Sequence, residues 1–150
     1  MTAAEAGVVL GVDYGASRIG LAVSDPSGAI ALPLEVLRRR KGHSLVRDVL
    51  DVAEQKGATR IVVGLPLALD GTKGGSATSA EAFAQALGRR TSVPVVLWDE
   101  RLTTVEASRR LQDAGQSARQ QRGLVDKHAA CLMLGSYLES LRAGGARTAG

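Results

Sequence analysis

Short apolar runs, separated by turns and amphipathic segments, divide the chain into strands and helices. The runs 8–15 and 18–25 flank a small polar turn centred on 15–17 and predict a β-hairpin. A third run, 29–37, predicts a strand, and its Pro33 assigns that strand to a sheet edge because proline cannot donate a ladder hydrogen bond. Two further strands are predicted at 59–64 and 93–98.

Apolar residues at helical spacing predict helices between the later strands. One helix begins near Leu45 and stops near Gly57, since glycine favours a helix C-terminus. The next is predicted to open at a capping box made by Thr78 and Glu81, in which each side chain bonds a free backbone N–H of the first turn.

The last third of the chain predicts two more helices. A second capping box, Thr103 with Glu106, opens a short one, and residues 124–141 form a long helix that is apolar on nearly all sides and therefore buried. The polar and basic segment 116–123 between them is predicted to be a mobile loop. The whole makes one domain, 8–141, with a disordered N-terminus and a flexible C-terminal tail predicted at 1–7 and 142–150.

The order of these elements predicts an α/β fold with a five-stranded mixed sheet flanked by helices. The first three strands follow one another closely enough to form an antiparallel meander. The last two need right-handed helical crossovers and should run parallel to the first strand. Ligands bind such sheets beyond the carboxyl ends of the parallel strands, which here carry Asp13, Gly64 and Glu100.

Composition narrows the function classes. Aromatic residues are only 3% of the chain, which argues against recognition of single strands by base stacking. The net charge of +4 is compatible with a polyanionic partner without proving one. A single cysteine excludes a disulfide framework, no apolar run is long enough to span a membrane, and no signal peptide precedes Val8, so we expect a cytoplasmic protein.

Two acidic residues have both a structural and a functional interpretation. Asp13 ends a buried strand, where a charge is costly unless a hydrogen-bonding turn or a divalent cation compensates it. Asp126 begins the last helix, where the helix dipole favours an acid. Alternatively, the small Ala129 and Ala130 let that helix approach the sheet and bring Asp126 toward Asp13. The residues alone leave both choices open.

Three carboxylates that meet at one sheet edge could hold one or two hard divalent cations. The set would be Asp13, Glu100 and Asp126, with Asp99 as an alternative to Glu100 that has a shorter reach. Mg²⁺ or Mn²⁺ at such a site activates water for attack on a phosphodiester. No Ser-His-Asp or Cys-His arrangement supplies a protein nucleophile, so water is the expected one.

Several motifs, in order and at suitable spacing over about residues 8–140, resemble the YqgF/RuvX family: Gly11-Val12-Asp13-Tyr14-Gly15 with Arg18-Ile19-Gly20-Leu21-Ala22, Val63-Gly64-Leu65-Pro66, Trp98-Asp99-Glu100-Arg101-Leu102-Thr103-Thr104, and Asp126-Lys127-His128-Ala129-Ala130. The resemblance implies an RNase H-like fold in a bacterial protein. It also implies nuclease activity, either on the 5′ end of pre-16S rRNA or on Holliday junctions.

The resemblance carries the family's acidic triad onto Asp13, Glu100 and Asp126, with Mg²⁺ or Mn²⁺ as the implied cofactor. The chain departs from the better-known junction resolvases of this fold at residue 64. There the strand ends in Gly-Leu-Pro instead of an acid, and the second carboxylate comes from one strand further away.

Basic residues near these motifs are the expected nucleic-acid contacts: Arg18, Lys73, Arg101, Arg119, Arg122 and Lys127. Lys73 is equally well explained as a solvated loop residue, and Arg101 either holds Glu100 or meets the scissile phosphate. The glycines around Lys73 do not form a phosphate-binding P-loop motif.

Three function classes follow. The first is a metal-dependent nuclease acting on precursor rRNA or branched DNA; a junction resolvase would be expected to act as a dimer, whereas trimming of an RNA end does not need one. The second is a nucleotide-binding enzyme of the actin and sugar-kinase type. Proteins of that type pair two such domains around the nucleotide, whereas the 150 residues of this chain supply only one. The third is a non-catalytic RNA-binding assembly factor. We expect the nuclease.

Overall fold

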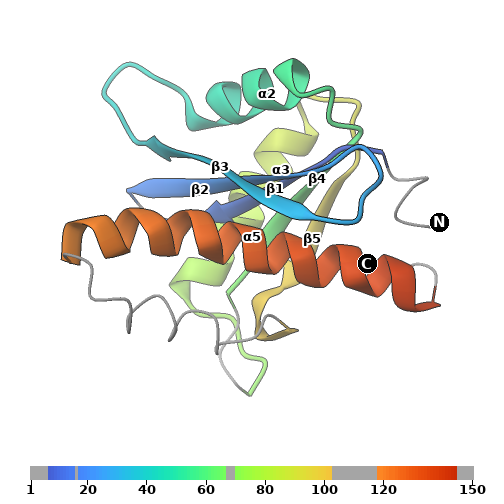
Figure 1. Ribbon diagram of the computed structural model, residues 1–150. Helices are drawn as coiled ribbons and strands as arrows, with labels where there is room; N and C mark the ends of the chain where they lie inside the picture. Colours follow the sequence, from blue (N-terminus) through green and yellow to red (C-terminus); the bar gives the residue numbers. More distant parts are fainter. Residues whose placement is uncertain (1–6, 16, 67–69, 103–117, 145–150) are drawn as a thin grey trace.

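The computed structural model describes residues 7–15, 17–66, 70–102 and 118–144, and it contains the predicted five-stranded mixed sheet (Figure 1). The strand order is β3-β2-β1-β4-β5. β1 is antiparallel to β2 and β2 to β3, whereas β4 is parallel to both β1 and β5. The strands are β1 (Val9–Tyr14), β2 (Arg18–Ser24), β3 (Ala31–Arg38), β4 (Arg60–Leu65) and β5 (Val95–Asp99).

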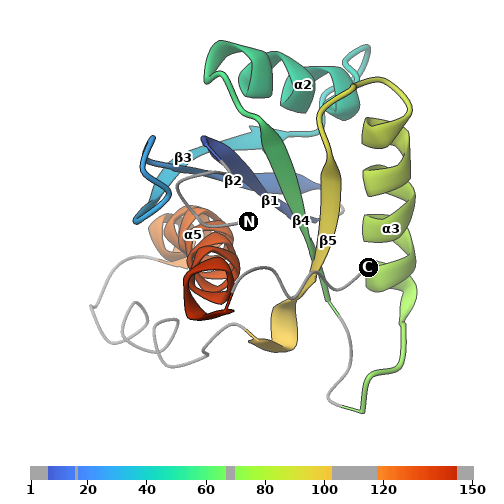
Figure 2. The same ribbon diagram turned by 90° about the vertical axis from the view of Figure 1, so that its right-hand side faces the viewer.

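Helices cover both faces of this sheet. Figure 2 shows the long helix on one face, with the two shorter helices on the other side. The carboxyl ends of β1, β4 and β5 are left at one edge, as predicted. The helical elements are α2 (Leu45–Gln55), α3 (Gly75–Gly88), the short 3-10 helix η1 (Glu100–Leu102) and α5 (Ala118–Gly144).

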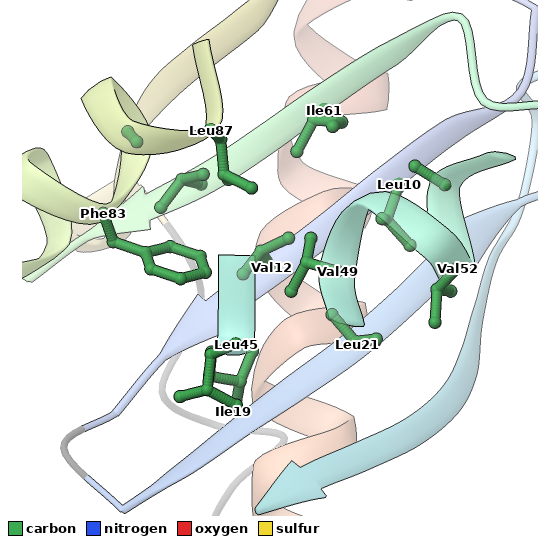
Figure 3. Close-up of a cluster of buried hydrophobic side chains, with 13 residues drawn as sticks. Leu10, Val12, Ile19, Leu21, Leu45, Val49, Val52, Ile61, Phe83 and Leu87 are labelled. Atoms are coloured by element: carbon green, nitrogen blue, oxygen red, sulfur yellow. The ribbon is translucent and has the colours of Figure 1, made fainter. Parts of the chain in front are cut away.

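Alternate residues of the strands face α2 and α3 and form the larger core. Leu10 and Val12 of β1 point toward Val49 of α2 and Phe83 of α3 (Figure 3). All four side chains are buried. Leu10 and Val12 share this face because successive strand residues point to opposite faces of the sheet. Burial of apolar side chains of this size contributes about 1.5–3 kcal/mol each, which fixes the hairpin against both helices.

The opposite face packs against α5 at very short range. The helix presents a buried stripe to the sheet, consisting of Ala130, Met133, Leu134, Tyr137, Leu138 and Leu141. A methyl group added at Gly11 of β1 would lie 2.9 Å from Cβ of Leu134. Gly11 therefore serves close packing between the strand and the helix.

Polar contacts fix α5 along its own axis. Arg60 Nη1 donates to the hydroxyl of Tyr137 at 2.6 Å, and Trp98 Nε1 donates to Oγ of Ser136 at 3.2 Å. The Trp98 and Tyr137 rings meet edge to face with centroids 5.4 Å apart. Two strands thus hold the helix in one register.

Pro33 lies on an edge strand, as the sequence predicts. β3 pairs only with β2, and the pairing shifts where Leu21 faces Glu35 and Ala22 faces Pro33. Leu34 is left out of the register, so the proline sits beside a β-bulge, one of the few strand positions that tolerate it.

The predicted capping box at Thr78 and Glu81 is wrong. Helix α3 begins at Gly75 with Gly74 as its N-cap, one turn earlier than expected. The Thr78 hydroxyl donates to the Gly74 carbonyl at 3.2 Å, and the Glu81 carboxylate pairs with Lys73. The hydroxyl is satisfied by the preceding turn of the helix, so it is not available as a cap.

The predicted mobile loop at 116–123 is wrong from residue 118 onward, because α5 begins at Ala118. Arginine and glutamine are good helix formers, and one glycine costs only about 1 kcal/mol inside a long helix. The helix also continues to Gly144, and Arg142 Nη1 donates to the carbonyl of Ala29 at 2.7 Å.

Other predicted features fall outside the described residues: the N-terminal end at 1–6 and the helix opened by Thr103 and Glu106. Within the described part of the chain, none of the helices has the length and apolar character of a membrane span.

We expect the Gly11→Ala variant to lower the free energy of unfolding by roughly 1–3 kcal/mol, because the methyl group collides with Leu134. Gly88→Ala is the matched control. Residue 88 ends α3 with open space around its Cα, so alanine should be neutral or stabilise by up to about 1 kcal/mol. Urea denaturation of both variants measures the difference; equal effects would show that the approach of α5 to β1 is not tight.

Candidate active site

Asp13 lies at the carboxyl end of β1 on the face covered by α5. It is half-buried and follows Gly11 by two residues, so both residues are on the same face of the strand, and Gly11 lies against that helix. Val12 pairs with Val63 of β4, so Asp13 is beside Gly64, and Gly64 in turn pairs with Trp98 of β5. The sheet register therefore brings the ends of β1, β4 and β5 together where the sequence predicted a site.

Glu100 begins η1 directly after β5, and its side chain reaches back across β4. The Glu100 carboxyl hydrogen-bonds the carboxylate of Asp13. On the way it passes over Gly64, where an added methyl group would overlap Oε1 of Glu100 and lie 3.1 Å from Cγ and Cδ. The structure thus brings together two of the three predicted acidic residues from strands that are not neighbours.

Burial and the neighbouring acids keep a proton on this pair. Burial raises the pKa of Glu100 from its usual 4.5 to about 8, and the hydrogen bond to Asp13 and the charges of Asp13 and Asp99 act in the same direction. The raised pKa favours the protonated form of Glu100, whose carboxyl hydrogen-bonds Asp13. Two half-buried carboxyls that resist joint ionisation suit a divalent cation, which would replace the proton between them.

Asp99 has a different partner. Its carboxylate accepts the backbone N–H of Arg101 at 2.9 Å, and Nε and Nη2 of the Arg101 guanidinium donate to it at 3.0 and 2.7 Å. This pairing lowers the pKa of Asp99. Of the two acids left open by the sequence, Glu100 is the one that faces Asp13, and Asp99 instead fixes the turn that aims it.

Arg101 also meets the loop that follows β4. Its Nη1 would lie 3.3 Å from a methyl group at Gly71, whose φ of +87° favours glycine. The same loop holds Asp70, whose carboxylate accepts from the backbone N–H and hydroxyl of Thr72 at 2.9 and 2.7 Å. Arg101 therefore stands between β5 and this loop, close to the acidic pair.

Lys73 ends that loop and pairs with the first half of α3. Its Nζ lies 2.8 Å from Oε2 of Glu81, and the lysine side chain is 53% exposed. The exposed ion pair leaves the ammonium group accessible, and its contact with nucleic acid stays a prediction.

Arg18 begins β2 on the same face of the sheet as Asp13. Asp13 pairs with Gly20, and Arg18 is two residues before it, so alternation puts both side chains on the α5 face. The turn between them is tight: a methyl group at Gly15 would lie 2.6 Å from the Arg18 carbonyl oxygen. Gly15 is required for the hairpin to close this near the site.

Asp126 is one turn before Ala130 in α5, in helical register with the buried Met133 and Tyr137. The helix stripe that the sequence assigned to the core is thus confirmed for Ala130, Met133 and Tyr137. The side chains of 118–127 lie outside the described part, including those of Arg119, Arg122, Asp126 and Lys127. Among the side chains that are described, no three acidic, histidine or cysteine residues converge as metal ligands.

The end of β1 is fixed from its other face as well. The Tyr14 ring packs on Phe83 of α3 with centroids 4.7 Å apart, and its hydroxyl accepts from Arg39 Nη2 at 3.2 Å. Tyr14 and Arg39 border a hollow of about 520 Å³ at the start of α3, lined also by Ser76 and Ser79. Only the tertiary structure places Arg39 here.

Solved structures of junction resolvases share this fold. RuvC of Thermus thermophilus in complex with a Holliday junction substrate superposes with a TM-score of 0.57 at 17% identity, over 89% of this chain and 95% of the other. The fowlpox virus Holliday junction resolvase superposes with a TM-score of 0.52 at 14% identity, over 89% and 99% of the two chains. The fold class is therefore RNase H-like, as predicted.

The chain belongs to the RuvX family, whose model, described as Holliday junction resolvase, matches residues 7–140. Two relatives named "Putative pre-16S rRNA nuclease" match over nearly their whole length. The relative from Desulforudis audaxviator is 42% identical over 91% of this chain and 96% of its own, and that from Nocardioides sp. is 46% identical over 94% and 93%. The predicted family resemblance is confirmed.

We expect the Glu100→Gln variant to gain stability over the wild type as pH rises. The folded protein retains on Glu100 a proton that the unfolded chain has released, so wild-type stability falls between about pH 4.5 and pH 8. The neutral glutamine has no such loss. In EDTA, urea denaturation should show the variant gaining roughly 1–2 kcal/mol on the wild type between pH 5 and pH 9.

Glu54→Gln, at an exposed position of α2, is the control and should show the same stability relative to the wild type at both pH values. A Glu100→Gln difference that does not change with pH would contradict the raised pKa.

Proposed function

We propose that this protein is a metal-dependent nuclease that hydrolyses phosphodiester bonds of structured nucleic acid, with the 5′ end of pre-16S rRNA as its substrate in the bacterial cytoplasm. The observation that carries the proposal is the Asp13–Glu100 carboxyl pair at the carboxyl edge of an RNase H-like sheet. The names of the relatives support the choice of reaction and substrate.

In this proposal Asp13, Glu100 and Asp126 hold Mg²⁺ or Mn²⁺. Hard oxygen ligands fit these cations, and the described pair resists joint ionisation, so a cation would replace the proton that the pair retains. The bound ion would supply activation of water and stabilisation of charge on the phosphate. Asp13 is held by β1, and Asp99 and Arg101 keep Glu100 turned toward it. Asp126 would join them, because it is one turn before Ala130, which α5 buries against this face of the sheet.

Basic residues around the acidic pair would bind the phosphate backbone. Arg18 shares the face of Asp13. Arg101 follows the end of β5, and Lys73 lies on the loop between β4 and α3. Arg119, Arg122 and Lys127 are carried by the first turns of α5, the helix that covers this face. Aromatic residues are only 3% of the chain, so contact with the nucleic-acid backbone is expected to dominate over base reading.

A Holliday junction is the second candidate substrate. The description of the family model favours it, and the resemblance to resolvases supports the same fold. Cleavage of a junction at two symmetric positions would require a dimer, whereas trimming of an RNA end would not.

We expect Asp13→Asn, Glu100→Gln and Asp126→Asn each to reduce Mn²⁺-dependent cleavage of a pre-16S rRNA fragment by at least about 100-fold, because each removes charge from the cation site. Asp51→Asn, at an exposed position of α2 on the far face, should cleave like the wild type. The assay runs on precursor rRNA and on a four-way junction side by side, with Mn²⁺ and with EDTA.

Preferential cleavage of the junction would transfer the proposal to the resolvase function. Undiminished cleavage by all three variants would contradict a carboxylate-held metal. A triple variant that still supports rRNA maturation in cells would favour a non-catalytic assembly factor.

We expect the Arg119→Gln/Arg122→Gln double variant to bind the same RNA more weakly and with a smaller dependence on salt. Each lost phosphate contact should reduce the slope of log K against log salt by about 0.7–0.9. Arg89→Gln/Arg90→Gln, just beyond the C-terminal end of α3 and away from the acidic pair, is the matched control. Binding titrations between 50 and 300 mM KCl measure both slopes, and equal slopes would exclude the start of α5 from the interface.

A further inference from the structure

Gly64 stands at the centre of the candidate site although it has no side chain. It lies between Asp13 on one neighbouring strand and Trp98 on the other, on the face that carries both acids. The space above its Cα is filled by Glu100: a methyl group there would overlap Oε1 and lie 3.1 Å from both Cγ and Cδ. The Glu100 carboxyl therefore occupies the volume in which a side chain of residue 64 would begin.

We propose that Gly64 is a positioning residue: because it has no side chain, Glu100 can cross β4 and reach Asp13. An acidic side chain at position 64 would put its carboxylate in the same place in the cation site as that of Glu100. The part that concerns the cation rests on the proposed function. The part that concerns packing does not.

Geometry makes this requirement specific. Glu100 follows β5, and β4 lies between β5 and β1, so its side chain must cross one whole strand. Neighbouring strands are about 4.7–4.9 Å apart, and any Cβ on the crossed strand would stand in the path. Gly64 differs from Gly11 on the adjacent strand, where the added methyl group would meet Leu134 of α5 and not an acid.

A double-mutant cycle in EDTA tests the packing. Gly64→Ala should lower the thermal midpoint by about 2–6 °C in the wild type and leave it unchanged or raise it in the Glu100→Ala background, since the colliding carboxyl is then absent. Gly11→Ala is the matched control and should lower the midpoint equally in both backgrounds. Equal effects of Gly64→Ala in the two backgrounds would overturn the proposal.

Mn²⁺ binding, measured by calorimetry, tests whether a carboxylate from residue 64 can occupy the position of the Glu100 carboxylate in the cation site. Gly64→Ala should weaken binding about 10–100-fold, as does Glu100→Ala, and the Gly64→Asp/Glu100→Ala variant should recover to within about tenfold of the wild type. A double variant that binds no better than Glu100→Ala would overturn the proposal. A wild type that binds no Mn²⁺ would instead overturn the proposed function, and the EDTA cycle would still report on Gly64.

Discussion

The meeting of Asp13 and Glu100 is the constraint on which the rest of the structure depends. Two half-buried carboxyls side by side are unfavourable when both are ionised, and burial alone already raises the pKa of Glu100. Nothing local would hold them together, since they come from strands separated by β4. The sheet register and the packing on both faces supply the free energy that keeps the pair in place.

That packing differs on the two faces for a reason. On the face of α2 and α3, large side chains fill the space and Tyr14 on Phe83 fixes the end of β1. On the face of α5, Gly11 allows close contact with the helix, and Gly64 leaves room for Glu100. Two strand glycines that look alike in sequence thus serve different partners, one a helix and one an acidic side chain.

Local patterns predicted most of the fold. Short apolar runs identified the strands, and Pro33 identified the edge, because both follow from the covalent structure of a few residues. The start of α3 was mispredicted because Thr78 and Glu81 match a capping box, whereas tertiary structure gives Glu81 to Lys73. The choice between Asp99 and Glu100 likewise needed the structure, since adjacent acids at a strand end differ only in the direction of the turn.

The site therefore depends on side chains that do not themselves reach the acidic pair. Asp99 is bound to Arg101, and this pair sets the turn from which Glu100 departs. Arg60 and Trp98 hold Tyr137 and Ser136, and so fix the register of the helix that bears Asp126. Such supporting contacts involve no carboxyl of the acidic pair, whereas the pair itself retains a proton that a cation would replace. A fold that fixes a carboxyl pair carrying one proton is preorganised for a divalent cation, because the ion can replace that proton without any rearrangement of the protein.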